Sequence, residues 1–516
     1  MKVIGLTTQQ EVMVGSRDHN FRINEFLMIM DGVQGDILGE VIEARTYNRF
    51  IPMDIGGDFV DDQVIKSLKA IGYDIDEETI YIAKVRFFNE SLYPVLTGSD
   101  VRIPEFKEIE KLLTPTSLQG GLLLGVIRNT ADLAKGMPDD LKNLLHTIEE
   151  GQLLSQREVP YLMDIRSMHQ YPHIGVFGGS GSGKSFGLRV LLEEFMEKQI
   201  PGIVLDPHYE MNFSQAAPEI GKNFDEGHQC FQIGVDIGVR FEDIKAGDLK
   251  NLLSAMSPLT DSMNNVVDVL FQRGNSYYTF SDKIDKLMKG QDEGTAERIQ
   301  SKIDYADTPE RKKEWEEVLK VFDKYNSKAP QASVRGINWR LHSLFHTGIF
   351  SKESTVIEEV LRLGKLAVIQ GSTQIIQVYA TYLLKDLYEK RRDYKDARFK
   401  QIAEADFFPP FFIITDESHN FAPKGYESPS KRVLREISQE GRKYGVFLVL
   451  ATQRPTLLDE TITAQLNTKM IFRTVRASDI DTIREETDLS SEETKRLPYL
   501  RTGDVFISSS QMGRTT

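Results

Sequence analysis

The sequence has few features of secreted or membrane proteins. One cysteine, Cys230, occurs among 516 residues, so no disulfide can form within the chain. No apolar run approaches the roughly 18–20 residues that a helix needs to cross a bilayer, and the N-terminus lacks the apolar stretch of a secretory signal. These absences favour a cytoplasmic protein with no membrane partner. We expect Cys230 to be a buried side chain that packs as a small hydrophobe.

An excess of positive charge is also absent. The chain has 63 Lys and Arg against 77 Asp and Glu, which gives a formal net charge of −14. This balance argues against a protein coated with basic patches. It still allows a few Lys and Arg side chains to line a channel for a nucleic-acid backbone. The chain is otherwise of ordinary globular composition, and its length predicts about two to four domains.

A glycine-rich stretch is the most informative segment that is present. Gly178–Ser185 matches the phosphate-loop pattern G-x-x-x-x-G-K-[S/T], between a predicted strand at His173–Phe177 and a predicted helix at Phe186–Lys198. In such a loop, backbone N–H groups and a helix N-terminus surround phosphate oxygens. Lys184 is predicted to reach the β- and γ-phosphates of ATP, and Ser185 to bind Mg²⁺. The full set of predicted nucleotide-binding residues is Gly178, Gly179, Ser180, Gly181, Ser182, Gly183, Lys184, Ser185 and Phe186.

A second predicted strand ends in two acids. Phe411–Thr415 is a continuous apolar run, which is typical of a buried parallel strand, and Asp416 and Glu417 follow it. The carboxyl end of such a strand is where ligands bind in open α/β sheets. We predict that Asp416 holds the Mg²⁺ ion and that Glu417 polarises the attacking water.

The γ-phosphate sensor has two candidates. Gln453 follows the predicted strand Gly445–Ala451, beside the acidic strand, and is the preferred one. Gln370 ends a strand of its own and is a weaker competitor.

Phosphoryl transfer also commonly needs an arginine that compensates charge at the γ-phosphate. Arg442 lies just before a core strand, at the end opposite the chain's own nucleotide, so it could serve a neighbouring subunit in a ring. A solvated basic turn is the alternative interpretation of this segment, and Arg473 and Arg476 are alternative arginines.

The order of predicted elements indicates an α/β protein with a separate β-rich start. Short strands parted by turn residues predict a small barrel, and strands that alternate with helices predict a parallel sheet. A further helix is expected at Asp61–Ile71. The predicted divisions are 1–105 barrel, 106–165 connector, 166–243 first part of the ATPase core, 244–346 charged helical insertion and 347–516 second part of the core.

Several of these segments together resemble the HerA branch of the HerA/FtsK hexameric ATPases. The matching segments are Gly178–Ser185, Asp206–Glu210, Asp416–Pro423, Glu440–Gly445, Ala451–Pro455 and Leu497–Leu500. The β-rich start is similar to the family's HAS-barrel, so the resemblance covers nearly the whole chain. The sequence departs from the family at Tyr209, where a glycine often follows Asp-Pro-His.

The resemblance implies a RecA-like core in a homohexamer that moves double-stranded DNA through a central pore. It supports the roles given to Lys184, Ser185, Asp416 and Glu417, and it makes Arg442 the preferred arginine acting across the subunit interface and Gln453 the preferred sensor. It also implies a separate nuclease or sirtuin-like NADase partner, in DNA repair by end processing or in antiviral defence. The chain itself contains no nuclease or NADase motif.

The predicted DNA contacts and the predicted motor activity each have an alternative interpretation. Lys424, Lys431, Arg432 and Arg435 follow the acidic strand and could contact phosphates, but a solvated amphipathic helix packed on its own core is the slightly preferred interpretation of them. A hexameric scaffold that binds ATP and organises an effector would use the same ATP site as a translocase. A conjugation-type coupling ATPase usually brings transmembrane helices, and none is found in this sequence.

Overall fold

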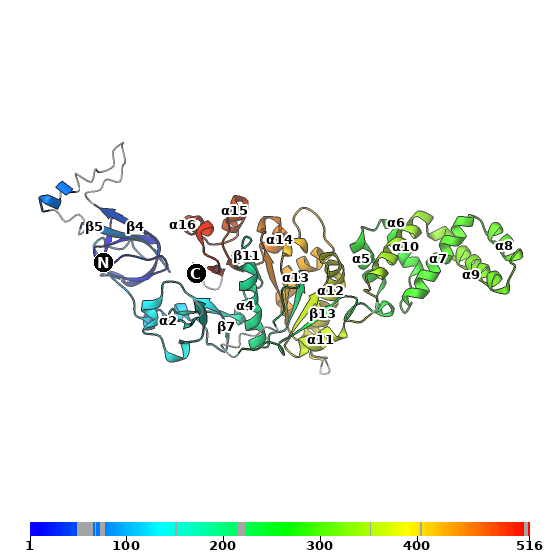
Figure 1. Cartoon of the computed structure of the whole chain (residues 1–516), viewed down its shortest axis with the longest axis horizontal. Helices are drawn as coiled ribbons and strands as arrows, with labels where there is room; N and C mark the ends of the chain where they lie inside the picture. Colours follow the sequence, from blue (N-terminus) through cyan, green and yellow to red (C-terminus); the bar gives the residue numbers. More distant parts are fainter. Residues whose placement is uncertain are drawn as a thin grey trace. The chain divides into compact units, whose positions relative to one another are not determined.

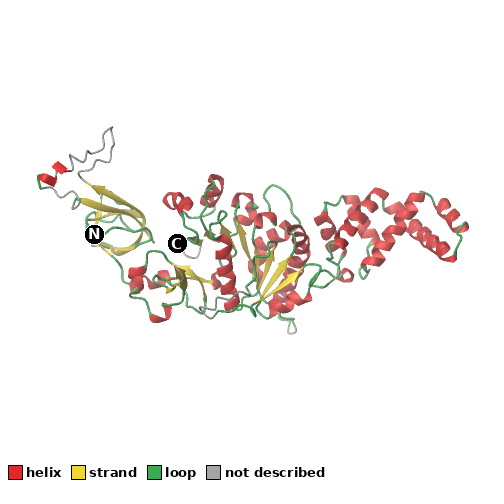
Figure 2. Ribbon diagram, in the orientation of Figure 1, coloured by secondary structure: helices red, strands yellow, loops and turns green. Residues whose placement is uncertain are grey.

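The computed structural model describes residues 1–48, 66–67, 69–72, 78–149, 152–213, 222–350, 352–402, 405–509 and 514–516. These residues form two compact units. The first unit contains Met1–Ser167 and Arg473–Thr516, and the second unit contains Met168–Phe472. Figure 1 labels their elements and Figure 2 separates helices from strands. The helix expected at Asp61–Ile71 lies largely outside the described residues.

The first unit begins with a closed β-barrel. Its strands follow the order β1-β2-β5-β4-β3-β6. Apolar side chains alternate along them and fill the interior, with Val14, Ile29 and Val85 fully buried. The small barrel predicted from the sequence is therefore confirmed. The strands are β1 (Lys2–Ile4), β2 (Glu11–Ser16), β3 (Phe26–Asp31), β4 (Gly35–Asn48), β5 (Thr79–Phe87) and β6 (Asp100–Arg102).

The rest of the first unit combines short helices with pairs of antiparallel strands. Strand β7 pairs with β10, β8 with β9, and β18 with β19, all antiparallel. Arg86 of β5 forms a two-point ion pair with Glu493 of α16, with N–O distances of 3.0 and 3.2 Å. The C-terminal helices are thus tied to the barrel. The elements are α2 (Phe106–Leu113), β7 (Gly121–Val126), α3 (Ala131–Ala134), η1 (Asp139–Leu141), β8 (His146–Glu149), β9 (Gln152–Ser155), β10 (Pro160–Asp164), α15 (Ala477–Glu485), α16 (Ser491–Arg496), η8 (Leu497–Tyr499), β18 (Phe506–Ser509) and β19 (Arg514–Thr515).

The second unit is built on a parallel sheet. Its described strands follow the order β13-β14-β12-β15-β16-β11-β17, and each neighbouring pair is parallel. One strand, β16, separates the strand before the phosphate loop from the acidic strand, as in RecA-like ATPases. The predicted α/β, RecA-like core is therefore confirmed. The strands are β11 (Ile174–Phe177), β12 (Gly202–Asp206), β13 (His228–Gln232), β14 (Leu366–Gln370), β15 (Phe411–Thr415), β16 (Val446–Thr452) and β17 (Thr468–Ile471).

Helices connect these strands. The 310 turn η2 (Ile165–His169) precedes β11 along the chain. The longest helix, α12, follows β14, and α13 lies between the acidic strand and β16. The helices and turns around the sheet are α4 (Lys184–Glu197), α11 (Thr355–Arg362), α12 (Thr373–Phe399), η6 (Ser418–Asn420), α13 (Lys431–Tyr444), η7 (Pro455–Leu457) and α14 (Glu460–Thr463).

A helical segment is inserted between β13 and β14. Its helices begin at capping side chains, for example Ser276, Thr295 and Thr308, which accept hydrogen bonds from the first turn. The segment contains η4 (Phe241–Asp243), α5 (Ala246–Met256), α6 (Asp261–Leu270), α7 (Tyr277–Glu293), α8 (Ala296–Asp304), α9 (Pro309–Tyr325), η5 (Asn326–Lys328) and α10 (Gln331–His346). Among the described helices of both units, none has the length and apolarity to cross a membrane.

The expectation of a buried Cys230 is wrong. This cysteine is exposed on β13, where Phe231 is the buried residue of the strand. Strand β13 pairs with β14 on one side and has no described strand on the other. An edge strand buries fewer of its side chains than a central strand does, which explains the exposure.

Candidate ATP site

The phosphate loop depends on close approaches that only glycine allows. Gly181 and Gly183 have φ values of +70° and +97°, in the left-handed region. A Cβ atom at Gly178 would lie 2.6 Å from Cβ of Phe472 and 2.7 Å from Oγ of Ser182. The loop runs from the fully buried strand β11 into α4, which begins at Lys184.

The structure brings the phosphate loop and the acidic pair together. Lys184, with 3% of its side chain exposed, forms an ion pair with Oδ1 of Asp416, and its Nζ lies 3.6 Å from Oε1 of Glu417. Ser185 Oγ donates to Oδ2 of Asp416 at 3.3 Å. Residues 232 positions apart in the sequence therefore form one cluster. The two carboxylates more than offset the single positive charge of the buried lysine.

The donor atoms at this cluster suit a phosphate and Mg²⁺. A serine hydroxyl and a carboxylate are hard oxygen ligands, which Mg²⁺ prefers. The described residues contain no group of three or more His, Cys, Asp or Glu that could hold a metal ion. Mg²⁺ is usually bound by one or two carboxylates together with substrate phosphates and water. Ser182 Oγ in the loop is buried and has no hydrogen-bond partner in the described protein. It is a spare donor at the place where phosphate oxygens are expected.

Glu417 is held in an unusual backbone conformation. Its φ and ψ are 46° and 47°, the left-handed region that a non-glycine residue rarely adopts. Its Oε2 accepts a long contact from the N–H of Gln453 at 3.5 Å and lies 3.3 Å from Nδ1 of His419. The turn thus aims the carboxylate back toward the cluster, and strain of this kind gathers at functional sites.

Sequence reasoning missed His419 and Thr452 as parts of this site. His419 Nδ1 lies 2.9 Å from Oγ1 of Thr452, at the end of β16. Burial lowers the pKa of His419, although the nearby charge of Glu417 opposes that shift. The motif Asp-Glu-x-His carried the signal, but the contact depends on β15 and β16 being neighbours.

The two candidate sensors have different surroundings. Gln453 is exposed, next to Glu417. Gln370 instead donates its side-chain amide to Oδ2 of Asp206 at 3.0 Å, and this carboxylate also accepts the N–H groups of Glu210 and Met211. Tyr209, just before Glu210, has a φ of +59°, a left-handed conformation that glycine adopts without strain.

The arginine candidates lie at separate places. Arg442 is exposed in the last turn of α13, at the start of β16, and its Nη1 donates to the carbonyl of Gln170 at 3.1 Å. The phosphate loop adjoins the other end of the neighbouring strand β11, so Arg442 points away from the chain's own cluster. Arg473 and Arg476 belong to the first unit, where Arg476 is exposed at the start of α15.

Most of the candidate DNA contacts are paired with acids. Lys431 and Arg435 lie 3.3 and 2.7 Å from Oδ2 of Asp459. Lys424 lies 2.6 Å from Glu460. Arg432 is exposed and lines a cleft of about 500 Å³ between α5, α12 and α13.

The geometry of the phosphate loop and the acid pair defines the class of protein. A phosphate loop whose lysine meets a strand-end acid pair across one intervening strand is the site of a RecA-like P-loop ATPase. The matching family model names a narrower group: residues 148–387 match the central domain of helicase HerA. Residues 148–387 are thus similar to the central domain of the HerA helicases, as the sequence motifs indicated, and the protein is an ATPase.

Known relatives cover most of the chain. It is 25% identical over 404 residues to the DNA double-strand break repair helicase HerA of Pyrococcus furiosus, spanning 72% of this chain and 69% of that protein. It is 24% identical over 545 residues to a probable helicase of Methanocaldococcus jannaschii, spanning 97% and 94%. Among solved structures, the bacterial conjugative coupling protein TrwB overlaps 79% of this chain and 89% of its own, with 12% identity and a TM-score of 0.43. That overlap is too loose to indicate a function.

Proposed function

We propose that the protein is an ATP-driven motor that moves double-stranded DNA through the central pore of a homohexamer. The proposal rests on one observation: Lys184 contacts both Asp416 and Glu417, and Ser185 contacts Asp416. The match to the HerA central domain supports the DNA substrate, because the curated relatives of the chain include DNA double-strand break repair helicases.

Each residue of the cluster has a proposed task. Lys184 exchanges its ion pair with Asp416 for the β- and γ-phosphates when ATP binds. Ser185 and Asp416 would hold Mg²⁺, and the bound ion would neutralise charge on the phosphates. Glu417 orients the attacking water and accepts its proton. Gln453, next to Glu417, senses whether a γ-phosphate is present.

Arg442 completes the site of a neighbouring subunit. It is exposed at the end of the sheet opposite the chain's own phosphate loop. A head-to-tail ring places one edge of each subunit against a different edge of the next. In such a ring, Arg442 reaches the γ-phosphate that the neighbour holds.

The motor serves a separate effector protein, a nuclease or a sirtuin-like NADase, in DNA repair or antiviral defence. The resemblance to the HerA ATPases supports this proposal, because it implies a separate effector polypeptide. Arg432, exposed beside the cleft of α13, is the strongest of the proposed DNA contacts.

A second candidate function is a hexameric scaffold that binds ATP without obligatory translocation. The acid pairing of Lys424, Lys431 and Arg435 favours it, because paired cations offer less charge to DNA phosphates.

Steady-state ATPase activity with and without linear duplex DNA, together with the mass by light scattering, tests the proposal. A motor should be a hexamer whose hydrolysis rises several-fold with DNA. Lys184→Ala should lose ATP binding, and Glu417→Gln should bind ATP and not hydrolyse it. A hexamer that hydrolyses ATP at the same rate with and without DNA, alone and with its effector, would support the scaffold instead.

A further inference from the structure

Two buried ionisable side chains of the second unit take no part in the ATP site. His173 lies just before β11 and is fully buried, and Arg391 of α12 is 6% exposed with no carboxylate partner among the described residues. Burying a charge or an imidazole is costly unless hydrogen bonds compensate for it. Each side chain directs its hydrogen bonds to backbone atoms, one bond to α13 and one to a segment packed beside it.

His173 joins α13 to β16. Its Nε2 donates to the carbonyl of Ser438 at 3.0 Å, and its Nδ1 accepts the N–H of Leu448 at 2.9 Å. This pair of contacts requires the neutral imidazole with the proton on Nε2. Burial lowers the pKa of His173 to about 4, so the neutral form holds at physiological pH. The next residue, Ile174, begins the strand that carries the phosphate loop.

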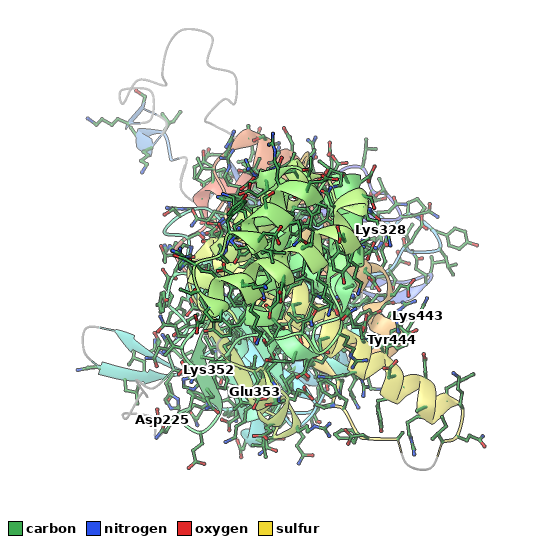
Figure 3. All side chains as sticks on the ribbon, turned by 90° about the vertical axis from the view of Figure 1, so that its right-hand side faces the viewer. Asp225, Lys328, Lys352, Glu353, Lys443 and Tyr444 are labelled. Atoms are coloured by element: carbon green, nitrogen blue, oxygen red, sulfur yellow. The ribbon has the colours of Figure 1, made fainter. Side chains whose placement is uncertain are left out.

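Arg391 holds the last residue of the same helix. Its Nε donates to the carbonyl of Tyr444, and its Nη1 donates to the carbonyl of Phe408, just before β15. A helix leaves its last carbonyl groups without partners inside the helix, so this guanidinium caps α13 from outside. Figure 3 labels Tyr444 and its neighbour Lys443 at this end of the helix.

The turn between these contacts is tightly packed. A Cβ atom at Gly441 would lie 2.5 Å from the carbonyl oxygen of Val446, and one at Gly445 would lie 3.2 Å from Nη2 of Arg391. Gly445 has a φ of +77°, which ends the helix in the left-handed conformation. Arg442 lies between these two glycines, and its side chain is exposed.

We propose that His173 and Arg391 are positioning residues that fix Arg442 for the neighbouring subunit's ATP. The inference rests on the proposed trans role of Arg442. His173 also links the strand of a subunit's own phosphate loop to the arginine that it offers its neighbour. Movement at one ATP site is thereby passed to the next site around the ring.

Two variants test this without touching the chain's own ATP site. His173→Asn tolerates the left-handed backbone at this position, where φ is +68°, but its side chain is too short to span Ser438 and Leu448. Arg391→Lys keeps a cation and loses the two-point contact. Lys443→Ala, at an exposed residue of the same turn, is the matched control. Each is examined for hexamer mass, binding of a non-hydrolysable ATP analogue, and hydrolysis.

We expect both variants to keep analogue affinity within about twofold and to lose about 10- to 100-fold in kcat, because a shift of about 1 Å in a catalytic group costs that much. Lys443→Ala should hydrolyse ATP normally. If one variant fails to fold, the other gives the same answer. Normal kcat in a folded His173→Asn or Arg391→Lys hexamer would overturn the inference.

Mixed hexamers separate a positioning role from general damage. Subunits with His173→Asn still offer an intact Glu417, and subunits with Glu417→Gln still offer a well-placed Arg442, so mixing the two should restore part of the activity. Mixing His173→Asn with Arg442→Ala should restore none, because both defects lie in the same half-site. If Arg442→Ala alone hydrolyses ATP at the normal rate, the proposed trans arginine fails. If Arg442→Ala is inactive and complemented by Glu417→Gln while His173→Asn is not complemented, the positioning inference alone fails.

Discussion

A methyl group added at Gly187 should destabilise the native protein and stabilise a variant in which Phe472 is shortened. Gly187 lies in the first turns of α4. A Cβ atom there would lie 2.3 Å from Cζ of Phe472 and 3.1 Å from both Cε atoms. Carbon atoms in contact are normally about 3.5–4.0 Å apart, so the ring must move by about 1 Å. It has little room, because Phe472 is buried and its N–H donates to the carbonyl of Phe177 at 2.7 Å.

Two opposing effects set the size of the change. Overpacking a core costs about 1–3 kcal/mol, and alanine is favoured over glycine inside a helix by about 1 kcal/mol. Gly187→Ala should therefore cost about 1 kcal/mol net in the wild-type protein. With Phe472→Ala already present the ring is gone, and the same change should gain about 1 kcal/mol. Phe472→Ala alone should cost about 3–5 kcal/mol.

A double-mutant cycle measured by denaturant or thermal unfolding tests this reasoning. The coupling between the two positions should be about 2 kcal/mol, and the sign of the Gly187 effect should reverse between the two backgrounds. Gly247→Ala in α5, whose added methyl group would meet no atom within 4 Å, is the control and should be neutral or stabilising. A Gly187→Ala effect of the same sign and size in both backgrounds would refute the steric argument.

Two further predictions concern buried charge. The pKa of His173 is about 4 in the folded protein and about 6.5 when unfolded, so its contribution of up to about 3 kcal/mol is present above pH 6.5 and is lost as the pH falls toward 4. Thermal melts should show a steeper loss of stability over that range for the wild type than for His173→Asn, and equal slopes would contradict the assignment. Asp459→Asn should lower the stability by about 3 kcal/mol, because Lys431 has only 4% of its side chain exposed. Glu460→Gln, which removes an exposed ion pair, should cost less than about 1 kcal/mol, and equal shifts in Tm would argue against the buried pair.

The central strands could be predicted from the sequence because both of their faces are covered. Leu366–Gln370 and Phe411–Thr415 are continuous apolar runs, and they occur as β14 and β15 with the same bounds. Strand β13 could not be predicted in this way, because its sequence His-Gln-Cys-Phe-Gln buries Phe231 alone. In the barrel, β1 and β2 are hard to predict because they are short and alternate between buried and partly exposed residues.

Only the residues of the candidate site that belong to recognisable motifs could be predicted from the sequence. The phosphate loop and the acid pair identify Lys184 and Asp416, which lie in contact in the structure. The left-handed backbone of Glu417 and the contact between His419 and Thr452 have no motif of their own. They arise from strand order, which brings the end of β15 beside the end of β16. The catalytic roles themselves stay predictions that the variants above can test.

The strand order also affects how the chain folds as it is made. Strand β11 pairs with β16 on one side and β17 on the other. Ile174 therefore cannot pair until Val449 and Thr468 have been synthesised. At about 5–20 residues per second, β16 follows β11 out of the ribosome by about 15–55 s. During that time the inserted helices α7 to α10 can form from contacts close in sequence. A nascent chain that ends before residue 446 contains the entire phosphate-loop motif and neither of the strands that hold it in shape.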